Sequence, residues 1–290
     1  MSVKGGISMG KKILLIVLII MTGLILFTPS LVYAAAAGMD RVEWFTHEPG
    51  YYYWVTSARQ ATDGGYIGTG YHTDSGANPD GAVLIKTDSS GNVIWKKYYP
   101  KSGARANDVV QLPDGGYLVV GAKSGDSEGY LFRTDSAGNL VWEKTLTDDF
   151  GAIGSIEKTY DGNYLIAGRS SSFFDGELAK IDIVGLVIWQ KQIPDYQSLV
   201  AQEDYQHNII YAGYDGAACV RKADPSGNTI WETRYADDKG MGISITPTSD
   251  HCYILAGMTI KNEVDVGYLV KLSPAGKIVW QRTYGSEVFA

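Results

Sequence analysis

Two short aromatic clusters contain the residues best suited to contact a ligand. Their members are Tyr51, Tyr52, Tyr53 and Trp54, and the adjacent pair Phe173 and Phe174. Exposed aromatic rings can stack on sugars or fill pockets in a protein partner. In the alternative, structural interpretation, the same rings close the mouth of a channel or cover the first repeat. The sequence leaves both interpretations open.

Residues that could catalyse a reaction form no recognisable set. The pattern Gly-x-Ser-x-Gly at Gly6–Gly10 precedes an apolar run and is not expected to form a nucleophile elbow. The four histidines, His47, His72, His207 and His251, lack the spacing of a metal site. We therefore predict neither a cofactor nor a metal. An enzyme of the quinoprotein, lyase or glycosidase type, with its site at a channel mouth, is the alternative function.

A basic residue stands nine positions before a tryptophan in five places. These residues are Lys86, Arg133, Lys180, Lys222 and Lys271. A ring of such charges could bind anions. The structural alternative, which we favour, is an ion pair with the acidic residue two positions later, as in Lys86 and Asp88. The last unit has Ser273 at that position, so this pairing is not obligatory.

The elements that must position these residues are repeated along the chain. One marker is the tryptophan series Trp44, Trp95, Trp142, Trp189, Trp231 and Trp280, separated by 51, 47, 47, 42 and 49 residues. A second marker is the glycine series Gly70, Gly121, Gly168, Gly213 and Gly257. Two markers with one period predict a repeat fold. The 35 glycines and 20 tyrosines favour turns and aromatic-rich strands over helices.

Each repeat is predicted to contain four short antiparallel strands. In the second unit they are 107–112, 117–120, 130–134 and 140–144, with an Asp-Gly-Gly turn after the first and an Asp-Ser-Ala-Gly-Asn turn after the third. Four such strands form the blade of a β-propeller. We therefore predict an all-β propeller of five complete blades, with the tryptophans filling the wedges between blades. An extra strand at Arg41–Phe45 precedes them, so the blades form either a five-bladed ring or part of a larger one.

The repeated motifs also resemble a known family. Sequences such as DGGYIGTG and KTDSSGNVIW resemble secreted bacterial and archaeal repeats of the form T-x-D-G-G-Y…K-x-D-x-x-G-N-x-x-W. More distantly they are similar to the quinoprotein-like (PQQ-like) propellers. The resemblance covers residues 41–290 and implies the propeller fold.

The first 36 residues have the pattern of an export segment. Lys11 and Lys12 precede an apolar run of 15 residues, Ile13–Phe27, and small residues follow up to Ala36. We expect a cleaved signal peptide or, alternatively, an uncleaved membrane anchor, followed by a propeller domain at 37–290. Removing residues 1–36 changes the net charge from −7 to −10. An acidic domain of this kind is poorly suited to bind nucleic acid or anionic membranes.

These observations predict a secreted or surface-located binding or scaffold module. It would recognise a protein or carbohydrate outside the cytoplasm, through the variable loops on one face of the propeller. A structural repeat protein of the cell surface is a further alternative. The two cysteines, Cys219 and Cys252, are expected either to form one bridge or to be free.

Overall fold

The described part of the chain is built from β-sheets. The structure, a computed structural model, describes residues 52–73, 80–100, 103–146, 150–214, 217–235, 240–261 and 264–285. Its one helical element in these ranges is the single 3-10 turn η1 (Ser124–Asp126). Within the same ranges no helix is long and apolar enough to cross a membrane. The predicted all-β class is confirmed.

The strands of the described ranges form five sheets of four, and each sheet is one blade. Blade 1 contains β1 (Tyr52–Gln60), β2 (Tyr66–Thr73), β3 (Gly81–Thr87) and β4 (Val93–Pro100). Blade 2 contains β5 (Arg105–Gln111), β6 (Tyr117–Lys123), β7 (Glu128–Thr134) and β8 (Leu140–Leu146). Blade 3 contains β9 (Phe150–Lys158), β10 (Tyr164–Ser170), β11 (Gly176–Ile181) and β12 (Val187–Ile193). Blade 4 contains β13 (Gln197–Glu203), β14 (Ile209–Tyr214), β15 (Ala218–Ala223) and β16 (Thr229–Tyr235). Blade 5 contains β17 (Met241–Pro247), β18 (Tyr253–Lys261), β19 (Val264–Leu272) and β20 (Ile278–Tyr284).

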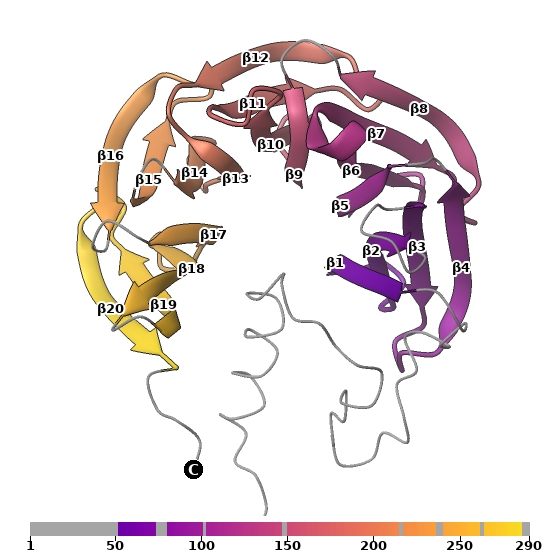
Figure 1. The fold of residues 1–290 in the computed structure, drawn as a ribbon, viewed down its shortest axis with the longest axis horizontal. Helices are drawn as coiled ribbons and strands as arrows, with labels where there is room; N and C mark the ends of the chain where they lie inside the picture. The colour runs from indigo at the N-terminus through magenta and orange to yellow at the C-terminus, as the bar shows by residue number, and fades with distance from the viewer. Residues whose placement is uncertain are drawn as a thin grey trace, which may run out of the picture.

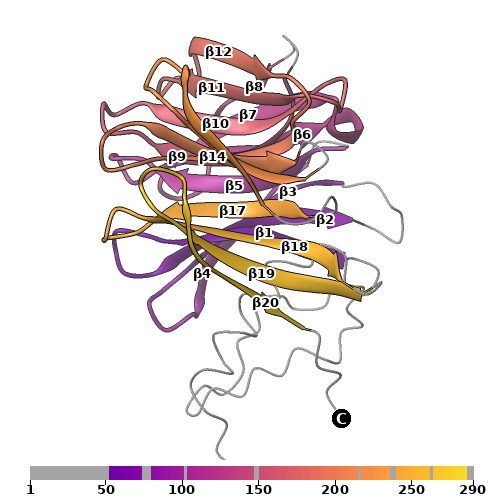
Figure 2. The same ribbon diagram turned by 90° about the vertical axis from the view of Figure 1, so that its left-hand side faces the viewer.

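Each blade is a meander in which every strand pairs antiparallel with its sequence neighbour. The first strand lies nearest the middle of the ring and the fourth forms the outer rim (Figure 1). The strands cross the thickness of the ring, so their connections gather on its two sides (Figure 2). We call the side with the first-to-second and third-to-fourth connections the turn face. The side with the second-to-third and blade-to-blade connections is the loop face.

Apolar side chains are buried between neighbouring blades. Four hydrophobic clusters join blades 1 and 2, 2 and 3, 3 and 4, and 4 and 5. Leu118 and Val119 of β6 are both fully buried, yet they belong to different clusters because successive strand residues point to opposite faces. Burying one such side chain stabilises the fold by about 1.5–3 kcal/mol. Because both faces of a middle strand are buried, its residues do not alternate between apolar and polar.

The five described tryptophans of the series lie on the fourth strands of their blades, and Trp95, Trp142 and Trp231 pack over a turn of the next blade. A Cβ added to Gly138 would lie 2.9 Å from the Trp95 ring, and one added to Gly185 would lie 2.8 Å from the Trp142 ring. Gly138 also has φ +77°, which a residue with a Cβ rarely adopts. The residue two positions after the tryptophan adds a hydrogen bond to the same turn, as from Lys144 to the carbonyl of Val184. Trp44 lies outside the described residues.

The second marker, the glycine that ends each DGGY-type run, is explained by a close backbone approach. A Cβ on Gly70, Gly121 or Gly168 would lie 1.8–2.0 Å from a carbonyl oxygen of the adjacent first strand. The register shifts by one residue at or next to these positions, which marks a β-bulge. Only glycine can occupy such a position, so this marker reports the backbone geometry of the blade.

Blades 1 and 5 lie at the two ends of the arc that the five described sheets form (Figure 1). Among the described residues, the hydrophobic clusters join only blades that are consecutive in the sequence. The predicted additional strand at Arg41–Phe45 lies outside the described residues. The five four-stranded blades are as predicted.

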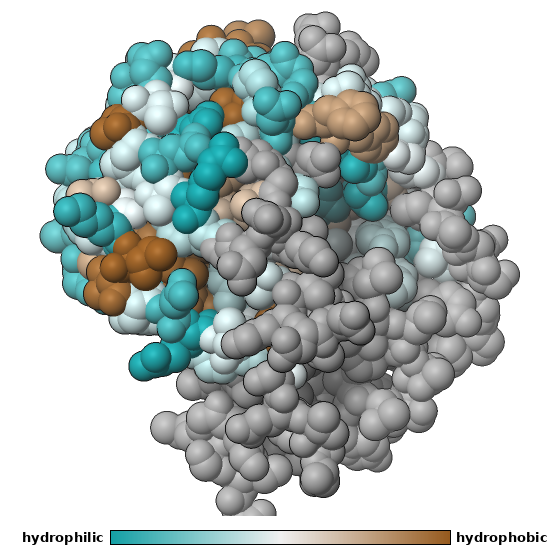
Figure 3. Space-filling view, turned by 60° about the vertical axis from the view of Figure 1, so that its left-hand side comes forward, coloured by the Kyte–Doolittle hydropathy of each residue, from teal (hydrophilic) through white to brown (hydrophobic). Residues whose placement is uncertain are grey.

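The outer wall of the ring carries single apolar residues instead of one continuous apolar belt. The residue before each described tryptophan of the series is half exposed on the outer strand: Ile94, Val141, Ile188, Ile230 and Val279. In the space-filling view, apolar patches are separated by hydrophilic residues (Figure 3). Scattered surface apolar residues of this kind are normal for folded proteins.

The repeated basic residues form ion pairs, but the expected partner was wrong. Lys86 pairs with Asp63 at 2.7 Å and Arg133 with Asp114 at 2.5 Å, and the other three pair with Asp161, Asp204 and Asp250. These carboxylates belong to the turn between the first and second strands. The acid two positions later caps its own turn instead: Asp88 Oδ1 accepts the N–H groups of Ser90 and Asn92. Because Lys271 pairs with Asp250, it does not need an acid at position 273.

The two cysteines do not form a disulfide bond with each other. Cys219 is buried in β15, within the cluster between blades 3 and 4, and Cys252 is partly exposed just before β18. A buried cysteine of this kind packs as a small apolar side chain.

Candidate functional site

The predicted aromatic residues that the structure describes lie at the loop-face ends of blades 1 and 3. Tyr51 lies outside the described residues, and Tyr52 begins β1. Tyr53 and Trp54 follow in β1, where their side chains point to opposite sides of the blade. Phe173 and Phe174 lie in the loop between β10 and β11 and are 40% and 70% exposed.

Tyr53 belongs to an aromatic group on one side of blade 1. Its hydroxyl lies 3.1 Å from the hydroxyl of Tyr98, and the His72 ring packs edge-on against Tyr98 at 5.4 Å. The ammonium group of Lys96 lies 4.9 Å from the ring centres of both tyrosines. Because these rings and the cation contact one another, Tyr53 already has a structural role.

Trp54 lies on the other side of β1 and stacks on Tyr71 of β2. The two rings are 6.2 Å apart with an interplanar angle of 17°. Burial raises the pKa of the Tyr71 hydroxyl, Asp126 acts in the same direction and Arg105 opposes them. The stacked pair therefore lies beside charged groups of blade 2.

Those charged groups connect blade 2 to blade 3 through a single carboxylate. Asp126, at the end of η1, accepts from Nη2 of Arg169 at 2.5 Å and pairs through the same oxygen with Arg105. Burial and the neighbouring Arg105 lower the pKa of Arg169, although Asp126 opposes them. The Arg169 guanidinium also lies 4.2 Å from the centre of the Phe173 ring. Two cations thus share one anion beneath an exposed aromatic ring.

We call this group the loop-face cluster; it consists of Trp54, Tyr71, Arg105, Asp126, Arg169 and Phe173. Its two loops have unusual backbone conformations: φ is +51° at Ser124, +74° at Asp126 and +69° at Phe173. Residues other than glycine rarely adopt positive φ, and such residues concentrate at functional sites.

The middle of the ring holds a second charged group, nearer the turn face. Arg59 of β1 donates to Asp108 of β5 at 2.8 Å and to Glu157 of β9 at 2.9 Å, joining three blades. Burial opposes the positive charge of Arg59, but the two carboxylates outweigh it and raise its pKa. Asp108 also accepts from Ser57 and from the backbone N–H groups of Val109 and Ile156.

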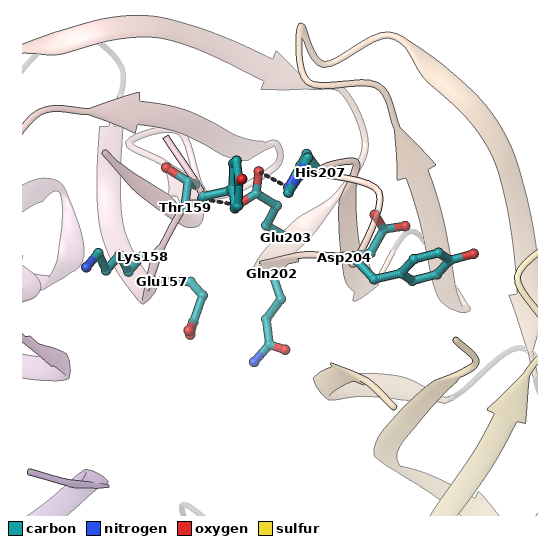
Figure 4. A pocket seen from close by; sticks show the side chains of 9 residues that line it. Glu157, Lys158, Thr159, Gln202, Glu203, Asp204 and His207 are labelled. Atoms are coloured by element: carbon teal, nitrogen blue, oxygen red, sulfur yellow. Dashed lines mark hydrogen bonds and ion pairs between the residues drawn. The ribbon is translucent and has the colours of Figure 1, made fainter. Parts of the chain in front are cut away.

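A hollow of about 480 Å³ opens on the turn face between blades 3 and 4. Figure 4 shows Glu157 and Gln202 extending side by side towards the middle of the ring, while Lys158 points away from them. Glu203 lies behind them, 3.7 Å from Nδ1 of His207, and accepts the backbone N–H of Tyr160. We call it the turn-face hollow.

The rim of this hollow carries aromatic rings stacked between consecutive turns. Tyr160 of blade 3 lies 4.0 Å from the ring of His207 of blade 4, and Tyr205 of blade 4 lies 3.9 Å from His251 of blade 5. Both histidines have φ +63°, at the turn position that glycine occupies in blades 1 to 3. Tyr160 is 80% exposed.

Sequence reasoning missed most of these residues. Arg105, Asp126 and Arg169 are single charges in strands and loops that show no motif. Glu157 and Gln202 are a polar pair only because two first strands lie next to each other. The replacement of Asp-Gly-Gly by Gln206-His207-Asn208 in blade 4 is a signal that the sequence does contain.

Comparison with known proteins identifies the family. A family model described as the outer membrane protein assembly factor BamB matches residues 34–206. The chain belongs to this PQQ-like propeller family. A search of curated proteins gave no match.

Solved structures similar to this PQQ-like propeller share its fold at low sequence identity. A protein of unknown function from Bacteroides caccae has TM-score 0.55 and 14% identity, over 80% of this chain and 82% of that one. The Dos1 propeller has TM-score 0.54 and 12% identity, over 81% of this chain and 59% of that one. A GH43 β-1,3-galactosidase solved with galactodeoxynojirimycin has TM-score 0.50 and 10% identity, over 74% and 90%. Such identities support the fold only.

The residues in the middle of this PQQ-like propeller do not fit a quinone cofactor. A planar group in the channel would have to displace Arg59, which binds carboxylates of two other blades. Both oxygens of Asp108 are engaged by donors, so this carboxylate is fixed as an acceptor. We assign no quinone chemistry to these residues.

Proposed function

We propose that this PQQ-like propeller is an extracytoplasmic binding or scaffold module that recognises a protein partner through its loop face. The observation that carries the proposal is the loop-face cluster, in which Arg105 and Arg169 share Asp126 beside the rings of Trp54 and Phe173. Tryptophan, tyrosine and arginine are the residue types enriched among binding hot spots. The proposed export segment at 1–36 would place the domain outside the cytoplasm.

A protein is the favoured partner because the cluster lies at one face of the ring and spans three blades. Its rings and guanidinium groups come from β1, β2, β5, β10 and a loop. Protein interfaces extend over about 800 Å² on each partner, whereas small ligands require a concave pocket. The family description, an assembly factor, also supports a protein partner.

The test begins with a partner isolated on the full chain and then purified. Its affinity is compared for the wild type, Arg169→Ala, Phe174→Ala and a control on the opposite face, Tyr160→Ala. Loss of a hot-spot side chain costs about 2 kcal/mol or more, so we expect Arg169→Ala to weaken binding about 30-fold. Phe174→Ala should weaken it less, and Tyr160→Ala should leave it unchanged. Equal affinity for all four proteins would refute the proposal.

A further inference from the structure

The turn-face hollow contains an aromatic platform with one covered and one open side. Tyr160 is 80% exposed, while the His207 ring lies 4.0 Å away at an interplanar angle of 31°. The backbone of Tyr160 is held by Glu203 of the next blade, which also lies 3.7 Å from His207. The ring is therefore positioned by its neighbours although it lies in solvent.

Polar groups for hydrogen bonding line the same hollow as this platform. Glu157 and Gln202 come from adjacent first strands and point side by side into the hollow (Figure 4). One carboxylate oxygen of Glu157 accepts from Arg59 at 2.9 Å. A carboxylate accepts hydrogen bonds, whereas an amide both donates and accepts. Together they match neighbouring hydroxyl groups, each of which can donate and accept.

The charge of the hollow narrows the ligand class. Three carboxylates, those of Glu157, Glu203 and Asp204, and one ammonium group, that of Lys158, line the hollow. Glu157 also pairs with Arg59 and Asp204 with Lys222. The whole chain carries −7. Phosphates, acidic sugars and nucleic acids would meet like charge in this hollow. A neutral ligand with a stacking face and several hydroxyl groups fits it better.

The backbone of blade 4 keeps an unfavourable conformation at this place. His207 has φ +63° where the corresponding residues of blades 1 to 3 are Gly64, Gly115 and Gly162. A glycine would relieve the strain but would remove the ring beneath Tyr160. The hollow has a volume of about 480 Å³ and is widely open to solvent, so a chain of sugars could lie along it.

We infer that the turn-face hollow is a second binding site for a neutral oligosaccharide, which stacks one sugar ring on Tyr160 and places hydroxyl groups of the chain on Glu157 and Gln202. The site is separate from the loop-face cluster and does not depend on the proposed function. It lies on the opposite face of the ring, so a glycan and a protein could be bound at the same time.

The test uses the full chain and a panel of neutral tetrasaccharides: cello-, xylo-, malto- and chito-oligosaccharides and β-1,3-linked galactan fragments. Titration calorimetry and saturation-transfer NMR measure binding. At least one member should bind with a dissociation constant below about 1 mM. Tyr160→Ala and Gln202→Ala should each weaken it about tenfold, the size expected for losing one stacking or polar contact. Phe174→Ala, an exposed aromatic on the loop face, is the matched control and should change it less than about twofold.

Three results would overturn the inference. One is no binding by any member of the panel at about 10 mM. Another is binding that survives both Tyr160→Ala and Gln202→Ala. The third is binding of tri-lysine that both variants abolish, which would make the hollow a site for cations. Thermal unfolding of each variant shows whether it is folded, and protein-partner affinity should respond to Phe174→Ala but not to Tyr160→Ala.

Discussion

The loop face and the turn face of this propeller both present aromatic rings beside charged groups, but they are built in different ways. On the loop face, the cluster depends on loops that differ between blades, such as η1 and the Phe173 loop. On the turn face, every blade keeps the same turn, and Tyr160 and His207 occupy positions that exist in all of them. A repeat protein can therefore acquire a site by varying a loop or by changing single residues within a fixed turn.

The largest expected effect comes from a buried ion pair beneath the turn face. Asp204 and Lys222 are the most deeply buried ion pair described, with side chains 0% and 5% exposed. Removing one partner of a buried pair costs about 3–5 kcal/mol, so Asp204→Asn should lower the free energy of unfolding by that amount at pH 7. Urea unfolding measures it. Asp88→Asn, in an exposed turn, is the control and should have a much smaller effect.

The same pair predicts how stability depends on pH. Burial opposes ionisation of Asp204, but hydrogen bonds from Lys222, Tyr253 and the turn backbone outweigh it and lower its pKa. A lowered pKa in the folded state stabilises the protein above the unfolded value of about 3.9, and this contribution is lost as the pH falls below it. Wild-type stability should thus decline below about pH 4, and Asp204→Asn should decline less steeply. Parallel curves would contradict this assignment.

A smaller loss of stability is expected from the charged group in the middle of the ring. Asp108→Ala leaves Arg59 with Glu157 and the carbonyl of Ile156, and it removes the acceptor of the Ile156 N–H group. Because Arg59 is 31% exposed and keeps these two partners, we expect a loss of about 2–3 kcal/mol in the free energy of unfolding. Asp108→Asn, which keeps the shape, should lose less. If Asp108→Ala were neutral, the three-blade network would contribute no stability.

The smallest expected change in the free energy of unfolding is that of a substitution at His207, on the turn face. His207→Gly removes a strained φ and also a ring stack, so the two contributions should nearly cancel, leaving a change within about 0.5 kcal/mol. Gly162→Ala, which places a Cβ at φ +84° in the preceding blade, should cost about 1 kcal/mol or more. A large loss in His207→Gly would mean that the stack serves to join blades 3 and 4.

Much of the fold could be predicted because the repeats carry local information. The second-blade strands were placed within a few residues of β5 to β8, since Asp-Gly-Gly and Asp-x-x-Gly-Asn turns fix where each strand ends. The ion pairs show the limit of such reasoning. Lys86 meets Asp63, 23 residues earlier, because neighbouring strands bring turns of the same face together. The sequence alone favours the nearer acid, Asp88, as the partner of Lys86.

The candidate sites were less predictable because they arise between blades. Phe173 could be recognised by its type, but Arg169 and Asp126 become neighbours only when blades 2 and 3 pack. Tyr53, predicted as a ligand contact, lies against Tyr98 and His72. The sequence shows that an aromatic ring is present. Whether that ring contacts the protein itself or a ligand depends on how the blades pack.

The contact between a tryptophan and the following turn runs in one direction only. Trp95 covers Gly138, Trp142 covers Gly185 and Trp231 covers Gly276, always from one blade onto the next. Blades 2 and 4 thus each offer two complementary edges, a glycine turn on one and a tryptophan on the other. Duplication or deletion of one repeat in the gene therefore joins edges that already match. Blade number in such a chain can change over evolution without the invention of a new interface.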